Sequence, residues 1–409
     1  MPVDAQRLLG DLRALARFTS DERGAQRVAW TDTWAAAREW ERGLLAELPV
    51  VVEIDEAGNQ WATLQGESPE ALIIGSHIDS VPDGGWLDGC LGVLAALEVL
   101  RGLSASGRPP LTVKLVDWAD EEGARFGQSL VGSAAAAGTL DPESLRGLRD
   151  ADGVSAPDAL AAHGVQLGSM LSARSRLARA VAYLELHIEQ GPVLEARGLP
   201  LGVVTGTYGT ERWSVKFTGQ AAHSGSTPMD QRRDALLAGA RLALAVRELA
   251  REHGGVATVG RLDAVPGIPT AVAGEARVMV DQRHVDAEVL ARVRAEAERA
   301  SRSIADEEQV EVSWSPLFRI APIPFDGELI ESLARIVSDL QGVDMRLPSG
   351  PLHDAARVAE AGVPTVMLFV ASLRGLSHTR EEDTGESDLA LALTAMDRLV
   401  GNVLQRAGG

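Results

Sequence analysis

Four short apolar segments that each run into polar residues restrict the fold of this chain more than any other feature. Segments 71–75, 111–118, 182–187 and 364–370 have the length and the aliphatic content of buried strands. Stretches with helical patterns, such as Gly89–Leu100, separate these segments along the chain. Because buried strands that alternate with helices are typical of α/β proteins, we predict an α/β domain.

The polar residues at the ends of these segments are histidine, aspartate and glutamate. In an open α/β sheet the carboxyl ends of the strands meet at one edge, where ligands bind. Imidazole nitrogens and carboxylate oxygens gathered there suit zinc, manganese or cobalt. We predict a site for two divalent metal ions, in which one glutamate of the adjacent pair binds metal and the other accepts a proton from water. The residues concerned are His77, Asp79, Asp88, Glu121, Glu122, His187 and His378.

The middle of the chain has the pattern of a second domain. Short alternating segments that predict half-exposed strands occur there together with two long helices. Since the α/β pattern flanks this region on both sides, we predict an α+β domain inserted into the first one. The inserted domain is placed at residues 210–322, and the surrounding domain at residues 1–209 and 323–409. Its expected elements are the strands 211–218, 256–259 and 276–280 and the helices 234–253 and 286–304.

Composition and absent motifs exclude several classes of function. The 409 residues carry a formal net charge of −19, which opposes binding to nucleic acid or to an anionic membrane surface. The sequence contains no phosphate-binding loop, no dinucleotide-binding glycine motif and no serine-hydrolase Gly-x-Ser-x-Gly motif. One cysteine, no secretory signal pattern and no long apolar segment predict a cytoplasmic protein without a membrane partner.

The polar residues belong to longer motifs that follow one another in order along essentially the whole chain. These motifs are Gly75–Gly85, Leu87–Gly89, Asp120–Phe126, Leu186–Glu195, Ala222–Met229, Ser349–Ala355 and Gly375–Thr379. In the first three the sequence resembles the dinuclear-metal aminoacylase and exopeptidase family. The others narrow the resemblance to its hydantoinase/carbamoylase branch, which contains N-carbamoyl-L-amino-acid hydrolases, allantoate amidohydrolases and β-ureidopropionases.

The resemblance implies a role for each polar residue at the strand ends. Asp88 would bridge two metal ions in a mixed-sheet catalytic domain, and Asp79 would orient His77. Glu121 would be the general base that activates water and later protonates the leaving amine. His77 and His187 would bind one metal ion. Glu122 and His378 would bind the other, and Asp88 would complete the set of five ligands.

For the inserted domain the resemblance implies a homodimer contact and a lid over the site. His223 of the partner subunit would stabilise the oxyanion at the attacked carbonyl. Thr270 stands where the branch usually has an asparagine that helps to hold the substrate carboxylate. Pro351-Leu352 replaces the usual Ala-Gly in a loop expected to line the pocket, so both changes concern the choice of substrate. The positions that match substrate contacts are Gln190, Arg212, Thr270, Arg283, Gly350 and His353, and the two arginines suit a small anionic substrate through its carboxylate.

These observations lead to one main hypothesis and three rivals. The main hypothesis is a metal-dependent amidohydrolase that cleaves the ureido C–N bond of an N-carbamoyl-L-amino acid or of a related ureido acid such as allantoate. An aminoacylase or dipeptidase would keep the metal site and cleave an ordinary amide, and a non-catalytic scaffold would only bind metal. A thiol hydrolase would use Cys90, for which the alternative is a small buried residue in the first turn of a helix.

Overall fold

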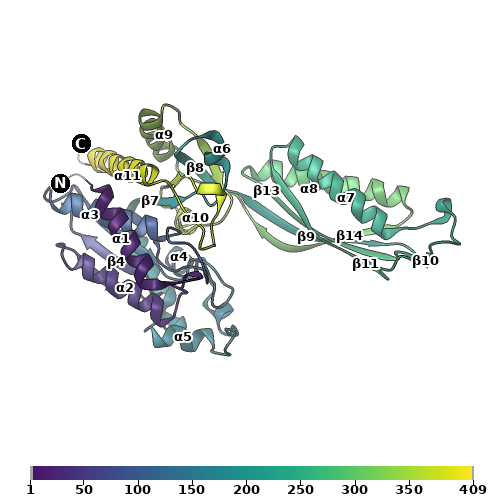
Figure 1. The fold of residues 1–409 in the computed structure, drawn as a ribbon, viewed down its shortest axis with the longest axis horizontal. Helices are drawn as coiled ribbons and strands as arrows, with labels where there is room; N and C mark the ends of the chain where they lie inside the picture. The colour runs from purple at the N-terminus through teal and green to yellow at the C-terminus, as the bar shows by residue number, and fades with distance from the viewer. Residues whose placement is uncertain (1–2, 408–409) are drawn as a thin grey trace. The chain divides into compact units, whose positions relative to one another are not determined.

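The structure is a computed structural model that describes residues 3–407. The prediction that the chain has no secretory signal pattern concerns Met1 and Pro2 in part, and these two residues lie outside the described ones. The chain forms two compact units (Figure 1). Unit 1 comprises the residues up to Thr205 and those from Phe325 onward, and unit 2 runs from Gly206 to Pro324. The sequence placed the corresponding borders at 210 and 322. Each unit has its own hydrophobic core.

Unit 1 is built on a nine-stranded mixed sheet in the order β15-β8-β17-β7-β5-β6-β4-β3, with β16 paired to β8. Its centre consists of four parallel strands, namely β17 (Thr365–Val370), β7 (Ala180–Ile188), β5 (Ser68–His77) and β6 (Leu111–Trp118). These strands are apolar along most of their length because both faces of the sheet centre are buried. They are the four strands that the apolar segments predicted.

On both sides of this centre the sheet continues with antiparallel pairs, which makes the sheet mixed. None of these outer strands carries an apolar run like those of the central strands, so the segment pattern did not identify them. Their bounds are β3 (Val51–Ile54), β4 (Gln60–Leu64), β8 (Leu201–Thr207), β15 (Ile323–Pro324) and β16 (Arg346–Ser349), and a separate hairpin pairs β1 (Ser20–Asp21) with β2 (Gly24–Ala25).

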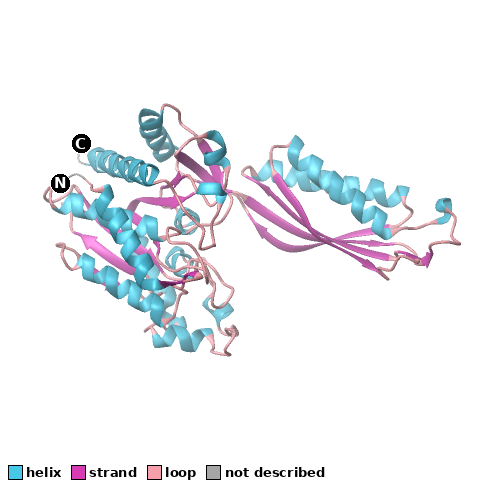
Figure 2. Ribbon diagram, viewed as in Figure 1, coloured by secondary structure: helices cyan, strands magenta, loops and turns pink. Residues whose placement is uncertain are grey.

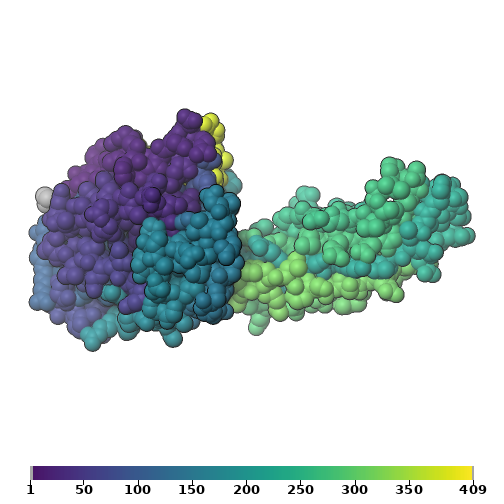
Figure 3. Space-filling view, turned by 90° about the horizontal axis from the view of Figure 1, so that it is seen from below, coloured from purple at the N-terminus to yellow at the C-terminus, as the bar shows by residue number. Residues whose placement is uncertain are grey.

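Helices pack around the sheet of unit 1. The helix α3 (Cys90–Ser104) contacts β5, β6 and β7, and it is apolar on almost every side because it is buried on almost every side. In the face drawn in Figure 3, the purple N-terminal residues form much of the surface of this unit. The other helices are α1 (Ala5–Thr19), α2 (Asp32–Leu45), α4 (Val131–Ala137), η1 (Pro142–Leu145), α5 (Ala156–Ala162), η2 (Leu167–Leu177), α6 (Val193–Arg197), α9 (Gly327–Gln341), α10 (Asp354–Glu360), η4 (Leu373–Gly375) and α11 (Glu386–Ala407).

Unit 2 has a four-stranded antiparallel sheet in the order β11-β13-β9-β14. Its two long helices lie along one face of this sheet, as Figure 2 shows, and bury their apolar sides there. A two-stranded ribbon of β10 and β12 completes the unit. The elements are β9 (Gly209–Thr218), β10 (Ala222–His223), η3 (Met229–Gln231), α7 (Ala235–Glu252), β11 (Val256–Val265), β12 (Ala271–Val272), β13 (Glu275–His284), α8 (Ala287–Glu307) and β14 (Glu311–Ile320).

None of the helices within residues 3–407 is both long enough and apolar enough to cross a membrane.

Candidate dinuclear metal centre

The parallel strands of unit 1 deliver the expected metal-binding side chains to one edge of the sheet. His77 is the last residue of β5, and His187 is the last but one of β7. Glu121 and Glu122 follow the end of β6, and His378 follows β17. Because these four strands are parallel neighbours, their carboxyl ends lie at the same edge. Segments far apart in the sequence therefore supply one cluster.

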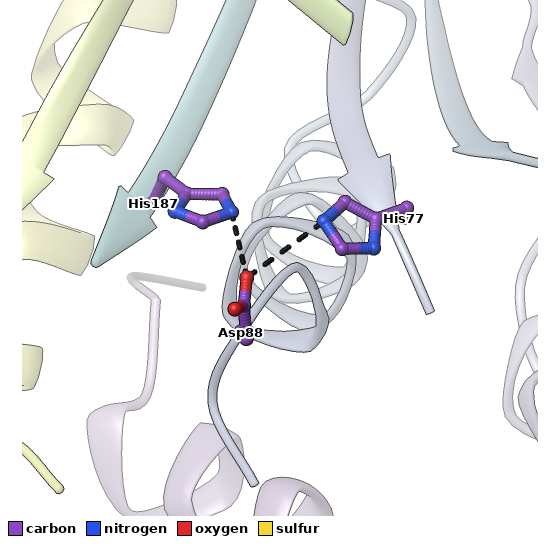
Figure 4. A group of neighbouring side chains, drawn as sticks. All are labelled: His77, Asp88 and His187. Atoms are coloured by element: carbon purple, nitrogen blue, oxygen red, sulfur yellow. Dashed lines mark ion pairs between the residues drawn. The ribbon is translucent and has the colours of Figure 1, made fainter. Parts of the chain in front are cut away.

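Asp88 lies at the middle of this cluster, in the loop that leads into α3. Figure 4 shows the rings of His77 and His187 pointing at its carboxylate from two strand ends. Asp88 Oδ1 lies 3.8 Å from His77 Nε2 and 3.1 Å from His187 Nε2. Asp88 Oδ2 lies 3.2 Å from His378 Nε2, which is also 3.3 Å from Glu122 Oε2. Each carboxylate oxygen of Asp88 thus faces a different pair of side chains.

The donor atoms form two groups that share Asp88. In one group the atoms come from His77, Asp88 and His187, and in the other from Asp88, Glu122 and His378. The atoms within each group lie within 4.8 Å of one another, which is close enough to surround a metal ion. A carboxylate common to two such groups is the arrangement expected of a bridging ligand.

The ring orientation of the two buried histidines also suits metal binding. His77 Nδ1 lies 3.1 Å from the carbonyl oxygen of Asp79, and His187 Nδ1 lies 2.9 Å from that of Ile188. Since a carbonyl only accepts, each Nδ1 carries the hydrogen, and the lone pair of each neutral ring is on Nε2. That is the nitrogen that faces Asp88. The backbone therefore holds both rings in the tautomer that a metal requires.

Asp79 connects the end of β5 with the glutamate pair. Its carboxylate accepts hydrogen bonds from the backbone N–H groups of Glu121 and Glu122, both at 3.2 Å. Asp79 Oδ1 also lies 3.5 Å from His77 Nδ1. A single buried carboxylate thus holds the backbone of both glutamates and lies beside the His77 ring.

Three residues of the site have left-handed backbone conformations that non-glycine residues rarely adopt. Asp120, Gln190 and His378 have φ angles of 59°, 57° and 56°. Such conformations cost about 1–3 kcal/mol each and persist only where the surroundings enforce them. Here they turn the chain sharply at the strand ends, so that the side chains that follow face the cluster.

Gly89 allows the loop with Asp88 to approach His77 closely. Its φ is 66°, and a Cβ atom at this position would lie 2.4 Å from both the His77 carbonyl oxygen and ring atom Cε1. A side chain cannot be accommodated there without moving the ring. The glycine is therefore a requirement of the geometry around Asp88.

Burial and the charges of neighbouring side chains shift the pKa values of the acids and histidines in the cluster. Burial raises the pKa of Glu121 well above its usual range, and the neighbouring carboxylates add to this effect. Burial, followed by the charge of Asp88, raises the pKa of Glu122 to about 7. The hydrogen bond with Asp88 raises the pKa of His378 to about 9. Burial disfavours the ionised form of Asp88, but the imidazole rings of His187 and His378 beside its carboxylate outweigh this effect and hold the pKa of Asp88 well below its usual value.

Unsatisfied polar atoms in the cluster suit the binding of positive charge. Among the described residues, His187 Nε2 and Glu122 Oε1 are buried and have no hydrogen bond of suitable geometry. Buried polar atoms normally have a partner, and several carboxylates rarely converge without positive charge. Metal ions would satisfy both needs, and the nitrogen and oxygen donors suit zinc, manganese or cobalt.

The expected substrate contacts in unit 1 lie in different surroundings. Gln190 Nε2 donates a 2.8 Å hydrogen bond to Asp88 Oδ2 and so lies at the cluster itself. His353 is buried behind the cluster, its ring centroid 4.4 Å from that of His187, and its Nε2 has no hydrogen-bond partner in the described part of the chain. Gly350 lies in the exposed loop after β16.

The expected substrate and oxyanion contacts of unit 2 form two separate sets. His223 in β10 pairs with Ala271, and Ser224 donates a hydrogen bond to the carbonyl of Thr270, so His223 and Thr270 lie together. Arg212 Nε and Arg283 Nε both donate to Asp281, at 2.7 and 2.8 Å.

Most of β9 separates the two sets. Arg212 is six residues before the end of this strand at Thr218, and β10 follows beyond that end (Figure 1). At about 3.3 Å per residue, six residues span about 20 Å. The two sets are therefore too far apart within one copy of unit 2 to contact the same small molecule.

Several acids that support the site were not predicted from the sequence. Glu382 accepts hydrogen bonds from the backbone of Leu87 and Asp88, and Glu185 accepts one from Ser76 behind His187. Asp281 reduces the joint charge of the two arginines from +2 to +1. Only Glu382 had a local signal, because it follows His378 by four residues in the same loop.

Cys90 has the surroundings of a structural residue. It is fully buried at the start of α3, and burial raises the pKa of its thiol to about 11. The reactive form of a cysteine is the thiolate, which this environment disfavours. The thiol-hydrolase hypothesis therefore loses its physical basis.

Comparisons with known proteins match almost the entire chain. A model of peptidase family M20/M25/M40 matches residues 73–402. An N-carbamoyl-L-amino acid amidohydrolase of Geobacillus stearothermophilus is 37% identical over 391 residues, which cover 93% of this chain and 94% of that protein. An allantoate amidohydrolase of Escherichia coli K12 is 35% identical over 384 residues and 92% of each chain. The crystal structure of a hydantoinase/carbamoylase family amidase from Burkholderia multivorans has a TM-score of 0.87 and 33% identity, covering 99% of this chain and 98% of that one.

Proposed function

Because this chain belongs to peptidase family M20/M25/M40, we propose that it is a metal-dependent amidohydrolase that cleaves the ureido C–N bond of an N-carbamoyl-L-amino acid or a related ureido acid such as allantoate. Relatives named for these two activities are 37% and 35% identical to it over nearly their full length. The observation that carries the proposal is the Asp88 carboxylate, whose two oxygens face two different sets of donor atoms. The net reaction consumes water and releases ammonia, carbon dioxide and the amine.

Two divalent ions would be held by the residues around Asp88. His77 and His187 would bind one ion, Glu122 and His378 the other, and Asp88 both. Ions bound there lower the pKa of water and polarise the carbonyl group that water attacks. Zinc, manganese and cobalt all suit these donors.

Glu121 is the general base in this proposal. It is buried, its carboxylate lies 3.8 Å from His77 Nε2, and the hydrogen bond from its backbone to Asp79 holds it in place. Burial raises its pKa well above the usual value, and a carboxylate of raised pKa can both accept a proton and return it. Glu121 takes a proton from the attacking water and transfers it to the nitrogen that leaves.

Arg212 and Arg283 bind the carboxylate of the substrate in this proposal. Their guanidinium groups share Asp281, which holds them side by side and leaves a net charge of +1 for the pair and Asp281 together. A planar guanidinium can bind a carboxylate through two parallel hydrogen bonds. Gln190, Gly350 and His353 would complete the substrate contacts.

His223 of the partner subunit stabilises the oxyanion in this proposal, which makes the enzyme a homodimer whose inserted domain is also the lid. About 20 Å of strand separates the His223 set from the Arg212 set, so one small substrate cannot reach both sets of a single copy. His223 Nδ1 accepts a hydrogen bond from the backbone of Gly225, so the neutral ring carries its hydrogen on Nε2. A ring in that state can donate to an oxyanion, and Thr270 lies beside it as a further polar contact.

The place of action is the cytoplasm in this proposal. The chain has one cysteine, Cys90, and it is buried without a disulfide partner. Such cysteine usage is typical of proteins in a reducing compartment.

The test is ammonia release by chelator-stripped protein to which zinc, manganese or cobalt is returned. The substrates are N-carbamoyl-L-amino acids, allantoate and N-carbamoyl-β-alanine. Matching N-acetyl amino acids are tested as well, and their hydrolysis is measured as release of the free amine. We expect metal-dependent release from at least one ureido compound. Turnover of the acetyl compounds alone would contradict the proposal and identify an aminoacylase instead. Two bound metals without any turnover would point first to a different substrate and second to a non-catalytic scaffold.

A further inference from the structure

The loop that carries Asp88 is anchored by a carboxylate that comes from the other end of the chain. Glu382 lies between η4 and α11, is only 2% exposed, and follows His378 by four residues. Its Oε1 atom accepts hydrogen bonds from the backbone N–H groups of Leu87 and Asp88, both at 3.0 Å. Two consecutive N–H groups bound to one oxygen fix the peptide plane from which the Asp88 side chain projects.

The second oxygen of Glu382 reaches the Asp88 carboxylate through a hydroxyl group. Ser377 Oγ lies 2.9 Å from Glu382 Oε2 and 3.0 Å from Asp88 Oδ2. Asp88 Oδ2 is the oxygen that faces His378. Glu382 thus contacts Asp88 at its backbone directly and at its side chain through Ser377.

The carboxylate of Glu382 fits beside the Asp88 loop because residue 85 is a glycine. A Cβ atom on Gly85 would lie 2.0 Å from Glu382 Oε1, so only glycine leaves room for the oxygen beside this loop. The hydrogen bonds join residues almost three hundred positions apart in the sequence. They also connect the segment that supplies His378 to the loop that supplies Asp88.

From these contacts we propose that Glu382 is a positioning residue that holds Asp88 at the correct distance from His378. It thereby determines the affinity for the metal ion that Asp88, Glu122 and His378 would bind. The inference rests on the proposed dinuclear site. Glu382 itself does not bind the metal, since its two oxygens are occupied by Leu87, Asp88 and Ser377. Its role is to place two ligands from distant segments at the separation that one ion requires.

Three variants separate this role from a general contribution to the fold. Glu382→Ala removes both acceptor oxygens, and because Glu382 lines a groove of about 750 Å³, water can reach the N–H groups left behind. Glu382→Gln keeps a carbonyl oxygen for both N–H groups, and its amide can donate to Ser377, whose single hydroxyl hydrogen is then directed to Asp88. Glu381→Ala is the matched control, because the neighbouring exposed glutamate pairs with Arg374 instead.

The experiment is calorimetric titration of each chelator-stripped full-length variant with Co²⁺, followed by measurement of kcat on the ureido substrate that the wild type hydrolyses. We expect the wild type and Glu381→Ala to bind two ions alike. In Glu382→Ala, one of the two sites should weaken by about 10- to 100-fold, with a parallel loss of kcat. Glu382→Gln should restore most of both. If Glu382→Ala lacks the wild-type circular dichroism spectrum, Glu382→Asp, which shortens the side chain by one methylene, replaces it with the same expectation.

Wild-type affinity for both ions in Glu382→Ala would overturn the inference, and so would equal weakening in Glu382→Gln or in Glu381→Ala. A wild-type protein that binds fewer than two ions, or that hydrolyses no ureido compound, would refute the proposed function instead. The two failures are therefore distinguishable in the same set of measurements.

Discussion

Substitution of Gly89 by alanine is the sharpest perturbation of the proposed metal centre that leaves every ligand in place. The added Cβ would lie 2.4 Å from the His77 carbonyl oxygen and from its Cε1 atom, whereas ordinary contact begins at 3.4 Å. The ring or the loop with Asp88 must therefore move by about 1 Å, a displacement that can reduce catalysis about 100-fold.

The same substitution has a cost in stability that follows from two terms. Alanine at a φ of 66° and a ψ of −49° costs about 1–3 kcal/mol, because residues with a Cβ rarely adopt this conformation. Insertion of a methyl group into a filled site costs about 1–3 kcal/mol more. We expect Gly89→Ala to lower the free energy of unfolding by about 2–6 kcal/mol.

Urea denaturation of the metal-free protein measures the loss of stability, and calorimetric metal titration with turnover measures the loss of function. Gly10→Ala is the matched control, because Gly10 lies in α1 with no atom within 4 Å of the added Cβ. That variant should gain about 0.5–1 kcal/mol. Wild-type metal affinity and wild-type turnover in Gly89→Ala would refute the close approach between this loop and His77.

Three further predictions concern the base, the partner subunit and a buried acid remote from the site. Glu121→Gln should reduce kcat by about 10²- to 10⁴-fold at unchanged metal content, and unchanged turnover would exclude Glu121 as the base. Mixing inactive Glu121→Gln and His223→Ala subunits should restore part of the activity, and no recovery after proven subunit exchange would count against a shared site. Burial, followed by the charge of Asp117, raises the pKa of Glu41 to about 8, so the folded chain binds a proton there that the unfolded chain releases near pH 4.5. Between these two pH values, Glu41 should lower the free energy of unfolding by up to about 1.4 kcal/mol for each unit by which pH rises. Urea denaturation at pH 5.5 and 7.5 should therefore show a smaller loss of unfolding free energy in Glu41→Gln than in the wild type.

The central strands and the long helices could be predicted because each is specified by local residues. The segment 111–118 has the same bounds as β6, and the helix expected at 234–253 lies within one residue of α7 at both ends. Apolar runs and helical periodicity report burial directly, so they identify elements in the sheet centre and amphipathic helices. Edge strands such as β3 and β14 are exposed along much of their length, and their sequences carry no such signal.

The candidate site shows the same division between local and distant information. The sequence indicated which side chains gather at the carboxyl edge, and the structure brings His77, Asp88, Glu122, His187 and His378 together there, while their binding of metal stays a prediction. The roles of Asp79 toward the glutamate backbone and of Glu382 toward the Asp88 loop depend on contacts between distant segments.

The sequence by itself determined the types of donor atoms, the strands that carry them and the family to which the chain belongs. These properties follow from residue identity, burial pattern and strand direction, which are local or repeat along the chain. Only the tertiary structure decided which oxygen of Asp88 faces which histidine, that Asp281 holds Arg212 and Arg283 together, and that Glu382 anchors the Asp88 loop. Hydrogen bonds between residues hundreds of positions apart depend on how strands align and loops turn, and no single segment encodes that alignment.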